Sequence, residues 1–311
     1  MEFEGVGGYY TWSSTHFPLL SQKKLAAGLL VLHPRVFSQP YYSVSSKIAY
    51  VCQGECIVGL ISSEDSKEEV IKLQKKDALP VTMKAMSWWY NDGDSILKII
   101  FLGEYDDEYT PGEYYGFFLT GAAGILNGFS NEFIAKSFHM MTKIEFQKLI
   151  EDLSISNPCI KINEGIKMPD PCNKDVKHKL VFNLDSAKPC AEVKNGGTLS
   201  AVTCSRIVLE GGALFGPIFT ADSSVQLSYV TKGSGRVQIV GPFADEGGIV
   251  FFSVVTSSKQ VYGELSGRKK SIWEAAPPSV LEASLNMTSD LTEFFKSKIA
   301  KGAVIAPPST I

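Results

Sequence analysis

The chain has 311 residues, of which 44% are hydrophobic and 20% are charged. This composition is typical of a soluble globular protein that buries a core. Its net charge of −3 gives no reason to expect a nucleic acid partner. The length exceeds what one core usually supports, so it predicts two domains of about 150 residues each.

The first eight residues, Met-Glu-Phe-Glu-Gly-Val-Gly-Gly, carry two acidic side chains and no basic ones. They therefore do not resemble a secretory signal peptide. No apolar run approaches the ~20 residues that span a bilayer, so we expect no membrane partner and a cytoplasmic location. In that compartment the six cysteines are expected to be reduced thiols. Cys52 and Cys56 flank a glycine, however, and the alternative is that they face each other across a hairpin.

Short apolar runs separated by turn residues follow one another from Tyr9 to about Leu102. This spacing is typical of an all-β sandwich or barrel. The predicted strands cover residues 25–32, 47–51, 57–61, 70–73 and 95–102.

Helices are predicted after these strands. Ser130 is placed to cap a helix over 131–138, and Thr142 with Glu145 forms a capping box at the start of another helix. Apolar residues then recur at i, i+3, i+4 and i+7 over 146–153. We therefore expect residues 1–153 to form a β-barrel with a helical extension.

The second half repeats this order after a linker. Residues 154–179 contain three prolines and end in a basic cluster, as expected for a connecting segment. A second domain is predicted over 180–311, again with strands before helices. Its strands are expected over 199–209, 225–231, 236–240 and 249–256, and its helices over 279–285 and 290–298.

The two halves also share short sequence motifs, which indicates an internal duplication. Tyr50-Val-Cys-Gln-Gly54 returns as Tyr229-Val-Thr-Lys-Gly233, and the apolar run on each side of the glycine predicts a β-hairpin. Leu119-Thr-Gly121 returns as Leu265-Ser-Gly267, but at an offset of 146 residues instead of 179. The second copy has therefore lost 33 residues (179 − 146 = 33) after its glycine.

The lost piece corresponds to Ser62 through Trp88-Trp89 of the first copy and amounts to two or three strands. Removing strands from a barrel exposes edges that invite pairing with another chain. We therefore expect the second barrel to be open, rearranged or completed by a partner.

These repeated features resemble the cupin superfamily. The resemblance rests on the glycine-centred pattern, the downstream Trp-Trp-Tyr-Asn91 and the extension that opens with Leu-Thr-Gly. More closely, the chain is similar to plant bicupins related to legumin-type (11S) seed storage globulins and glutelins, and residues 265–285 are the most specific match. The resemblance implies two jelly-roll barrels, a homo-trimer formed through the helical extensions, and a non-catalytic nutrient reservoir or structural function.

The resemblance also locates the metal site of enzymatic cupins in this sequence. Enzymatic cupins bind a divalent metal with three histidines and a glutamate, and these positions fall at Tyr41, Ser43, Lys47 and Ser87 in the first copy. In the second copy Gln226 replaces the glutamate. None of the four histidines is paired at ligand spacing. We therefore expect no metal, no cofactor and no oxidase or dioxygenase chemistry.

One candidate ligand pocket is predicted inside the first barrel, lined by Tyr41, Ser43, Lys47, Ser87 and Trp89. A lysine there could act as a base or an imine-forming amine, and a tyrosine as an acid. The alternative function is therefore a small-molecule binding protein or a metal-independent isomerase or lyase. The opposing interpretation is that Lys47 extends to the barrel mouth and that Tyr41 only packs.

Overall fold

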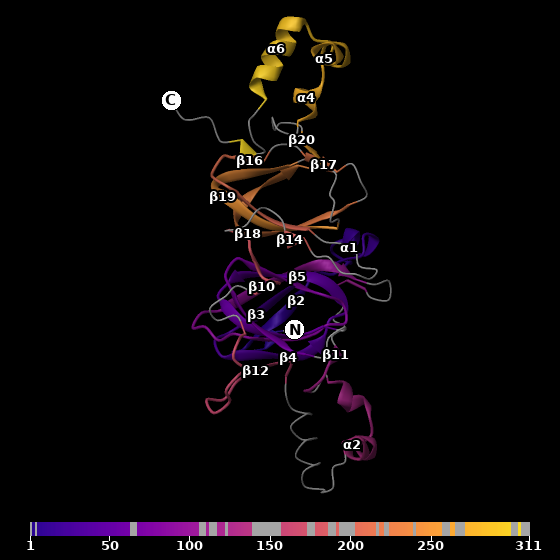
Figure 1. Cartoon of the computed structure of the whole chain (residues 1–311), viewed down its shortest axis with the longest axis vertical. Coiled ribbons are helices and arrows are strands. Elements are labelled where there is room, and N and C mark those ends of the chain that lie inside the picture. The colour runs from indigo at the N-terminus through magenta and orange to yellow at the C-terminus, as the bar shows by residue number, and fades with distance from the viewer. Residues whose placement is uncertain are drawn as a thin grey trace. The chain divides into compact units, whose positions relative to one another are not determined.

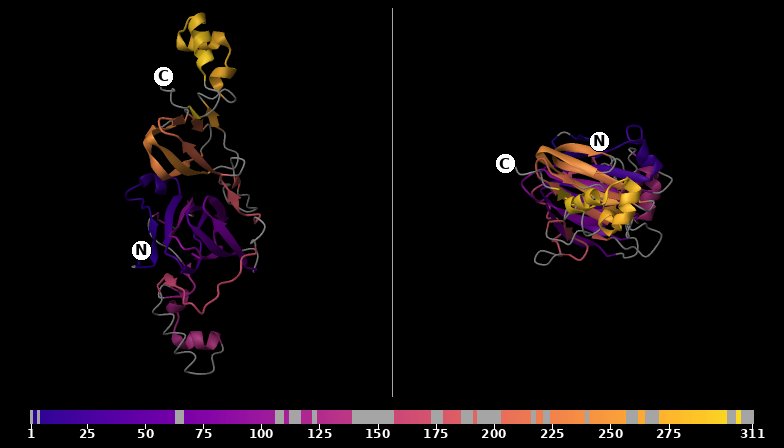
Figure 2. Two further views of the ribbon diagram at one scale, coloured as in Figure 1. Left: turned by 90° about the vertical axis from the view of Figure 1, so that its left-hand side faces the viewer. Right: turned by 90° about the horizontal axis from the view of Figure 1, so that it is seen from above.

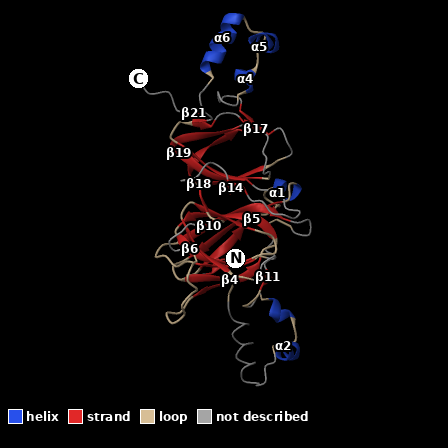
Figure 3. Ribbon diagram, in the orientation of Figure 1, coloured by secondary structure: helices blue, strands red, loops and turns tan. Residues whose placement is uncertain are grey.

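In the computed structural model the chain folds into two compact units, Met1–Val193 and Lys194–Ile311 (Figure 1). Strands predominate in both, which confirms the mainly β fold class (Figure 3). No helix in the described part of the chain is long and apolar enough to cross a membrane. The structure describes residues 2–3, 5–62, 67–105, 110–111, 117–121, 124–138, 157–172, 178–185, 191–192, 203–215, 218–220, 224–238, 241–256, 262–264, 271–299 and 304–305.

The first unit consists of two antiparallel sheets. In order across the first sheet, the strands are β1 (Glu2–Phe3), β2 (Gly7–Thr11), β3 (Leu25–Leu32), β10 (Leu97–Tyr105), β5 (Ser45–Gln53), β8 (Asp77–Val81) and β13 (Phe182–Asn183). In order across the second, they are β11 (Phe117–Phe118), β4 (Val36–Tyr42), β9 (Met86–Tyr90), β6 (Glu55–Ile61) and β7 (Glu69–Gln74), and β12 (Cys159–Lys161) also pairs with β4.

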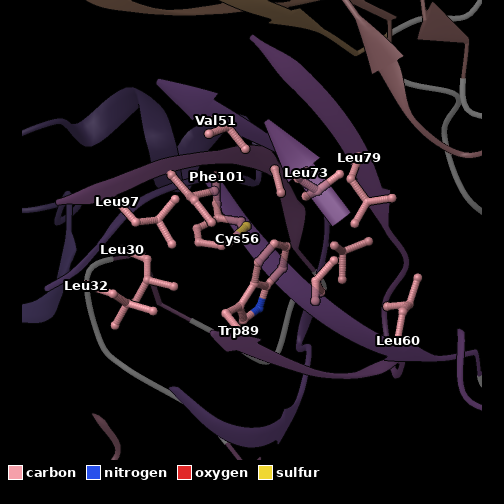
Figure 4. Packing of buried hydrophobic residues seen from close by; sticks show 14 of the residues in the cluster. Leu30, Leu32, Val51, Cys56, Leu60, Leu73, Leu79, Trp89, Leu97 and Phe101 are labelled. Carbon is pink, nitrogen blue, oxygen red and sulfur yellow. The ribbon is translucent and has the colours of Figure 1, made fainter. Parts of the chain in front are cut away.

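The hydrophobic core of this unit draws on both sheets (Figure 4). Leu97 and Phe101 come from the first sheet, and Cys56 and Trp89 come from the second. The Trp89 ring packs edge-on against Phe101, with 5.3 Å between ring centroids. Most of the buried side chains in this unit are aliphatic or aromatic, and Lys47, Ser87 and Asn91 are among the polar exceptions.

Gly54 is a corner between the two sheets, so the predicted hairpin is wrong. β5 pairs with β10 and β8, whereas β6 pairs with β7 and β9. A φ of 77° at Gly54 turns the chain from one sheet into the other, a conformation that glycine adopts without steric cost. Cys52 and Cys56 consequently lie in different sheets, and both are free thiols, as expected.

The first unit also includes the described parts of the segment that was expected to be a linker. Within 154–179, strand β12 pairs with β4, and beyond it β13 pairs with β8. The structure therefore divides the chain after Val193, later than the sequence suggested. The remaining elements of this unit are α1 (Pro18–Gln22), η1 (Ile125–Gly128), α2 (Asn131–Ser137) and β14 (Ala191–Glu192).

The predicted helices that the structure describes begin close to their predicted starts. Ser130 caps α2, since its hydroxyl accepts a hydrogen bond from the Phe133 N–H, which confirms that helix. Figure 2 shows α2 standing away from the sheets of its own unit. The helix predicted to open at Thr142 lies outside the described residues.

In the second unit, one sheet contains β15 (Thr203–Leu209), β19 (Gly241–Val255), β16 (Leu214–Phe215) and β21 (Val304–Ile305) in that order. β18 (Gln226–Gln238) also pairs with β19, and β17 (Ile218–Thr220) pairs with β20 (Tyr262–Glu264). The helices α4 (Ile272–Ala275), α5 (Pro278–Leu285) and α6 (Ser289–Lys298) follow; α5 and α6 lie close to their predicted bounds, whereas α4 was not predicted. The Thr288 hydroxyl caps α6 by accepting from the Leu291 N–H.

The missing strands of the second copy can be identified. Strands β15, β19 and β18 pair as β3, β10 and β5 do in the first unit. In the second unit β18 continues past Gly233, and the next strand is β19. In the first unit, β7, β8 and β9 lie between the corresponding stretches of chain. These three strands fall in the interval predicted to be lost, which confirms the shortened second barrel.

Candidate functional site

Lys47 is buried inside the first barrel. It lies on β5, and only 9% of its surface is exposed. Its Nζ atom lies 3.5 Å from the Tyr41 hydroxyl, 5.2 Å from the centre of the Tyr41 ring and 4.8 Å from that of Phe101. The side chain therefore does not extend into solvent at the barrel mouth.

The Lys47 ammonium lies over the faces of two aromatic rings, whereas a buried ammonium is normally neutralised by a carboxylate. Within the described residues, no acidic side chain forms an ion pair with Lys47. An ammonium over aromatic faces gains on the order of 1–2 kcal/mol when it is removed from water. Phe101 and Tyr41 thus account for part of the stability of this buried amine.

Tyr41 and Ser87 lie directly opposite each other where β4 pairs with β9. The Ser87 hydroxyl accepts a hydrogen bond of 3.3 Å from the indole N–H of Trp89 two residues later. Ser43 is buried nearby, but its hydroxyl donates to the backbone carbonyl of Ser45 at 2.6 Å and serves a local turn. The structure therefore joins Tyr41 to Lys47, places Ser87 and Trp89 on the adjacent strand, and directs Ser43 away.

Three aromatic residues near the amine were not predicted from the sequence. Besides Phe101, these are Phe118, whose ring lies 5.6 Å from that of Tyr41, and Tyr9, whose ring lies 6.0 Å from that of Phe101. Burial, together with the neighbouring Tyr41, raises the pKa of Tyr9 well above its usual value. Phe101 belongs to the continuous apolar run 99–102, where no alternation indicates which side chains point inward.

The donors gathered here do not suit a metal ion. Lys47 offers an ammonium, Tyr41 a phenol and Ser87 a hydroxyl that already accepts a hydrogen bond. A charged ammonium has no lone pair and repels cations, so the set favours an anionic group instead. In the described part of the chain, no three His, Cys, Asp or Glu side chains gather as metal ligands.

The buried cysteines do not supply a nucleophile. Burial raises the pKa of Cys52 to about 12 and that of Cys159 to about 11, and it raises the pKa of Cys56 as well. Because the thiolate is the reactive form, these thiols are inert at neutral pH.

Comparison with known proteins agrees with this architecture. The cupin family model matches residues 3–144. Pumpkin seed globulin is similar with a TM-score of 0.80 and 18% identity, covering 99% of this chain and 96% of that chain. The coconut allergen cocosin is similar with a TM-score of 0.79 and 21% identity, at the same coverage. No curated protein sequence matches this chain.

A third similar structure is the 11S globulin from Wrightia tinctoria, described as revealing an auxin binding site. Its TM-score is 0.78 at 17% identity, and the match covers 98% of this chain and 93% of that chain. At such identities the likeness shows the fold. Together with the family match, it confirms the resemblance to legumin-type cupins.

Proposed function

Because the cupin family model matches residues 3–144, we propose that this chain is a metal-free plant bicupin of the storage-globulin type, without catalytic activity. One observation carries the proposal. The positions that hold metal in cupin enzymes bear Tyr41, Lys47 and Ser87, and the buried ammonium would oppose any cation there. The likeness to seed storage globulins over nearly the whole chain supports a reservoir role.

Protein abundance tests the reservoir role. A storage protein accumulates during seed filling and is consumed during germination. Quantitative mass spectrometry of seeds and leaves is expected to show a seed-specific rise followed by depletion. A constant, low amount in every tissue would overturn the proposal.

We further propose that the chain forms a homo-trimer through its helical extensions. On and beside α2, Phe129, Phe133 and Phe138 are between 50% and 55% exposed. On α6, Leu291 and Phe294 are 51% and 58% exposed. Exposed apolar side chains grouped on a helix are typical of an interaction surface, and two different surfaces in contact generate a closed ring.

The trimer can be tested with a matched pair of variants. Phe133→Glu is expected to convert the trimer to smaller species in sedimentation velocity, because the carboxylate would be buried in the contact. Phe17→Glu makes the same change at a residue 52% exposed and outside these helices, and it should leave the trimer intact. Equal behaviour of the two variants would argue against the helical contact.

The second candidate function is a small-molecule binding site at Lys47. The specific observation is a buried amine whose one described hydrogen-bond partner is the Tyr41 hydroxyl, 3.5 Å away. Such an amine can pair with a carboxylate or condense with an aldehyde. The auxin binding site reported for the Wrightia globulin supports testing an aromatic acid of this kind first.

Native mass spectrometry with added auxin tests this candidate. A one-to-one adduct is expected with the unaltered chain and not with Lys47→Met, which keeps the length of the side chain and removes its charge. Lys232→Met is the matched control, because Lys232 is exposed and lies in the other unit. Adducts that persist in Lys47→Met would place the ligand elsewhere.

A further inference from the structure

Strand β18 is bordered on one side only within the described part of the second unit. Its counterpart in the first unit, β5, lies between β10 and β8. β18 pairs with β19, the counterpart of β10, through Gln226 opposite Val255 and Val230 opposite Phe251. The counterpart of β8 lies in the deleted stretch, so no described strand occupies the outer edge of β18.

The same deletion leaves apolar side chains uncovered. Counted from Gly54 and from Gly233, Val51 corresponds to Val230, and Val58 corresponds to Val237. Val51 and Val58 are both 0% exposed, whereas Val230 and Val237 are 45% and 73% exposed. Edge strands that combine open backbone groups with exposed β-branched residues readily add a further strand.

The sequence of β18 is self-complementary, so the same strand of a second copy can pair with it. In an antiparallel pair centred on Ser228, Leu227 faces Tyr229 and Gln226 faces Val230. At the end of the pair Lys232 faces Ser224, so no two like charges meet. Aliphatic–aromatic pairs across antiparallel strands stabilise the sheet, and like charges would destabilise it.

We propose that β18 pairs antiparallel with β18 of a second copy, so that two second units share one continuous sheet. The contact is two-fold symmetric and involves none of the helices. It is therefore additional to the association proposed for the helical extensions.

Two double variants that differ only at residue 226 test the register. Gln226→Lys with Val230→Lys places lysine opposite lysine twice, whereas Gln226→Glu with Val230→Lys places opposite charges in the same two positions. Both sites are exposed, so neither variant buries a charge in the isolated chain. Both are made in the full chain carrying Phe133→Glu and Phe294→Glu, which removes the helical contacts.

The parent chain is expected to sediment at twice the 34.0 kDa mass of a single chain. The lysine–lysine variant should sediment as a monomer and the glutamate–lysine variant as a dimer. In addition, when the variant is oxidised by dissolved oxygen, Ser228→Cys should give a disulfide between the two copies at residue 228, identified by peptide mass spectrometry. A monomeric parent chain, or the same mass for both double variants, would overturn the proposal.

Discussion

Gly103 lies directly opposite Lys47 where β10 pairs with β5. A Cβ atom on Gly103 would stand 2.6 Å from the Lys47 Cα and 2.8 Å from its Cβ, and closer still to the Ser46 carbonyl oxygen. Gly103→Ala therefore forces β5 and β10 apart and is expected to lower the free energy of unfolding by about 2 kcal/mol. Urea denaturation measures the change.

The control for this prediction is Gly165→Ala. A Cβ at Gly165 would meet nothing within 4 Å, so the free energy of unfolding should change by less than about 0.5 kcal/mol. If both variants were equally stable, β5 and β10 would not be packed as closely as they are here.

Two substitutions of Lys47 are expected to change the free energy of unfolding by different amounts. Lys47→Met keeps the packing and removes an ammonium that has no carboxylate partner within the described residues, so stability should change by less than about 1 kcal/mol. Lys47→Glu places a carboxylate against the electron-rich faces of Tyr41 and Phe101 and should cost about 3 kcal/mol. Comparable losses in urea denaturation would show that the amine makes a contact that methionine cannot replace.

Alkaline pH should destabilise the fold through its buried thiols. The pKa of Cys159 rises from 9.0 to about 11 in the folded chain, so the unfolded chain loses this proton first as pH increases. The contribution is fully present below pH 9 and is lost between pH 9 and about 11, at about 1.4 kcal/mol per pH unit. Unfolding midpoints measured over this range should fall less steeply for Cys159→Ala. Cys172→Ala, which removes an exposed thiol, is the control and should keep the original slope.

The duplicated valines offer a comparison of equivalent positions. Val58→Ala removes methyl groups from a fully buried side chain and should cost about 2 kcal/mol. Val237→Ala affects a side chain that is 73% exposed and should cost less than about 0.5 kcal/mol in the single chain. A large loss at Val237 would mean that another surface covers this residue under the conditions of the measurement.

The sequence predicted strands such as β3, β5 and β6 and the helices α2, α5 and α6 because their signals are local, whereas α1, α4 and strands such as β4 and β8 were not predicted. The bounds of β3 are those read from its apolar run, and Ser130 identified α2 through capping. The corner at Gly54 was misread because a glycine between two apolar runs looks the same whether the runs pair with each other or enter different sheets. That choice depends on long-range pairing with β8, β9 and β10.

The candidate site was predicted in part. The family resemblance placed Tyr41 and Lys47 in one pocket, and the structure brings their side chains together, with 3.5 Å between the Lys47 Nζ and the Tyr41 hydroxyl. The resemblance gave no information on the Ser43 hydroxyl, which a local turn directs toward Ser45, or on Phe101, which comes from the later strand β10. Side-chain direction in turns and across sheets is set by contacts that spacing alone does not contain.

Strands β12 and β13 lie at the edges of different sheets in the first unit. β12 is fixed to the edge of one sheet through β4, and β13 is fixed to the edge of the other through β8. The covalent connection between them limits how far the two sheets can separate, which lowers the entropy of any partly opened state. A protease that cuts the chain between β12 and β13 would leave every strand in place and still loosen the barrel, because the edges of the two sheets would no longer be joined there.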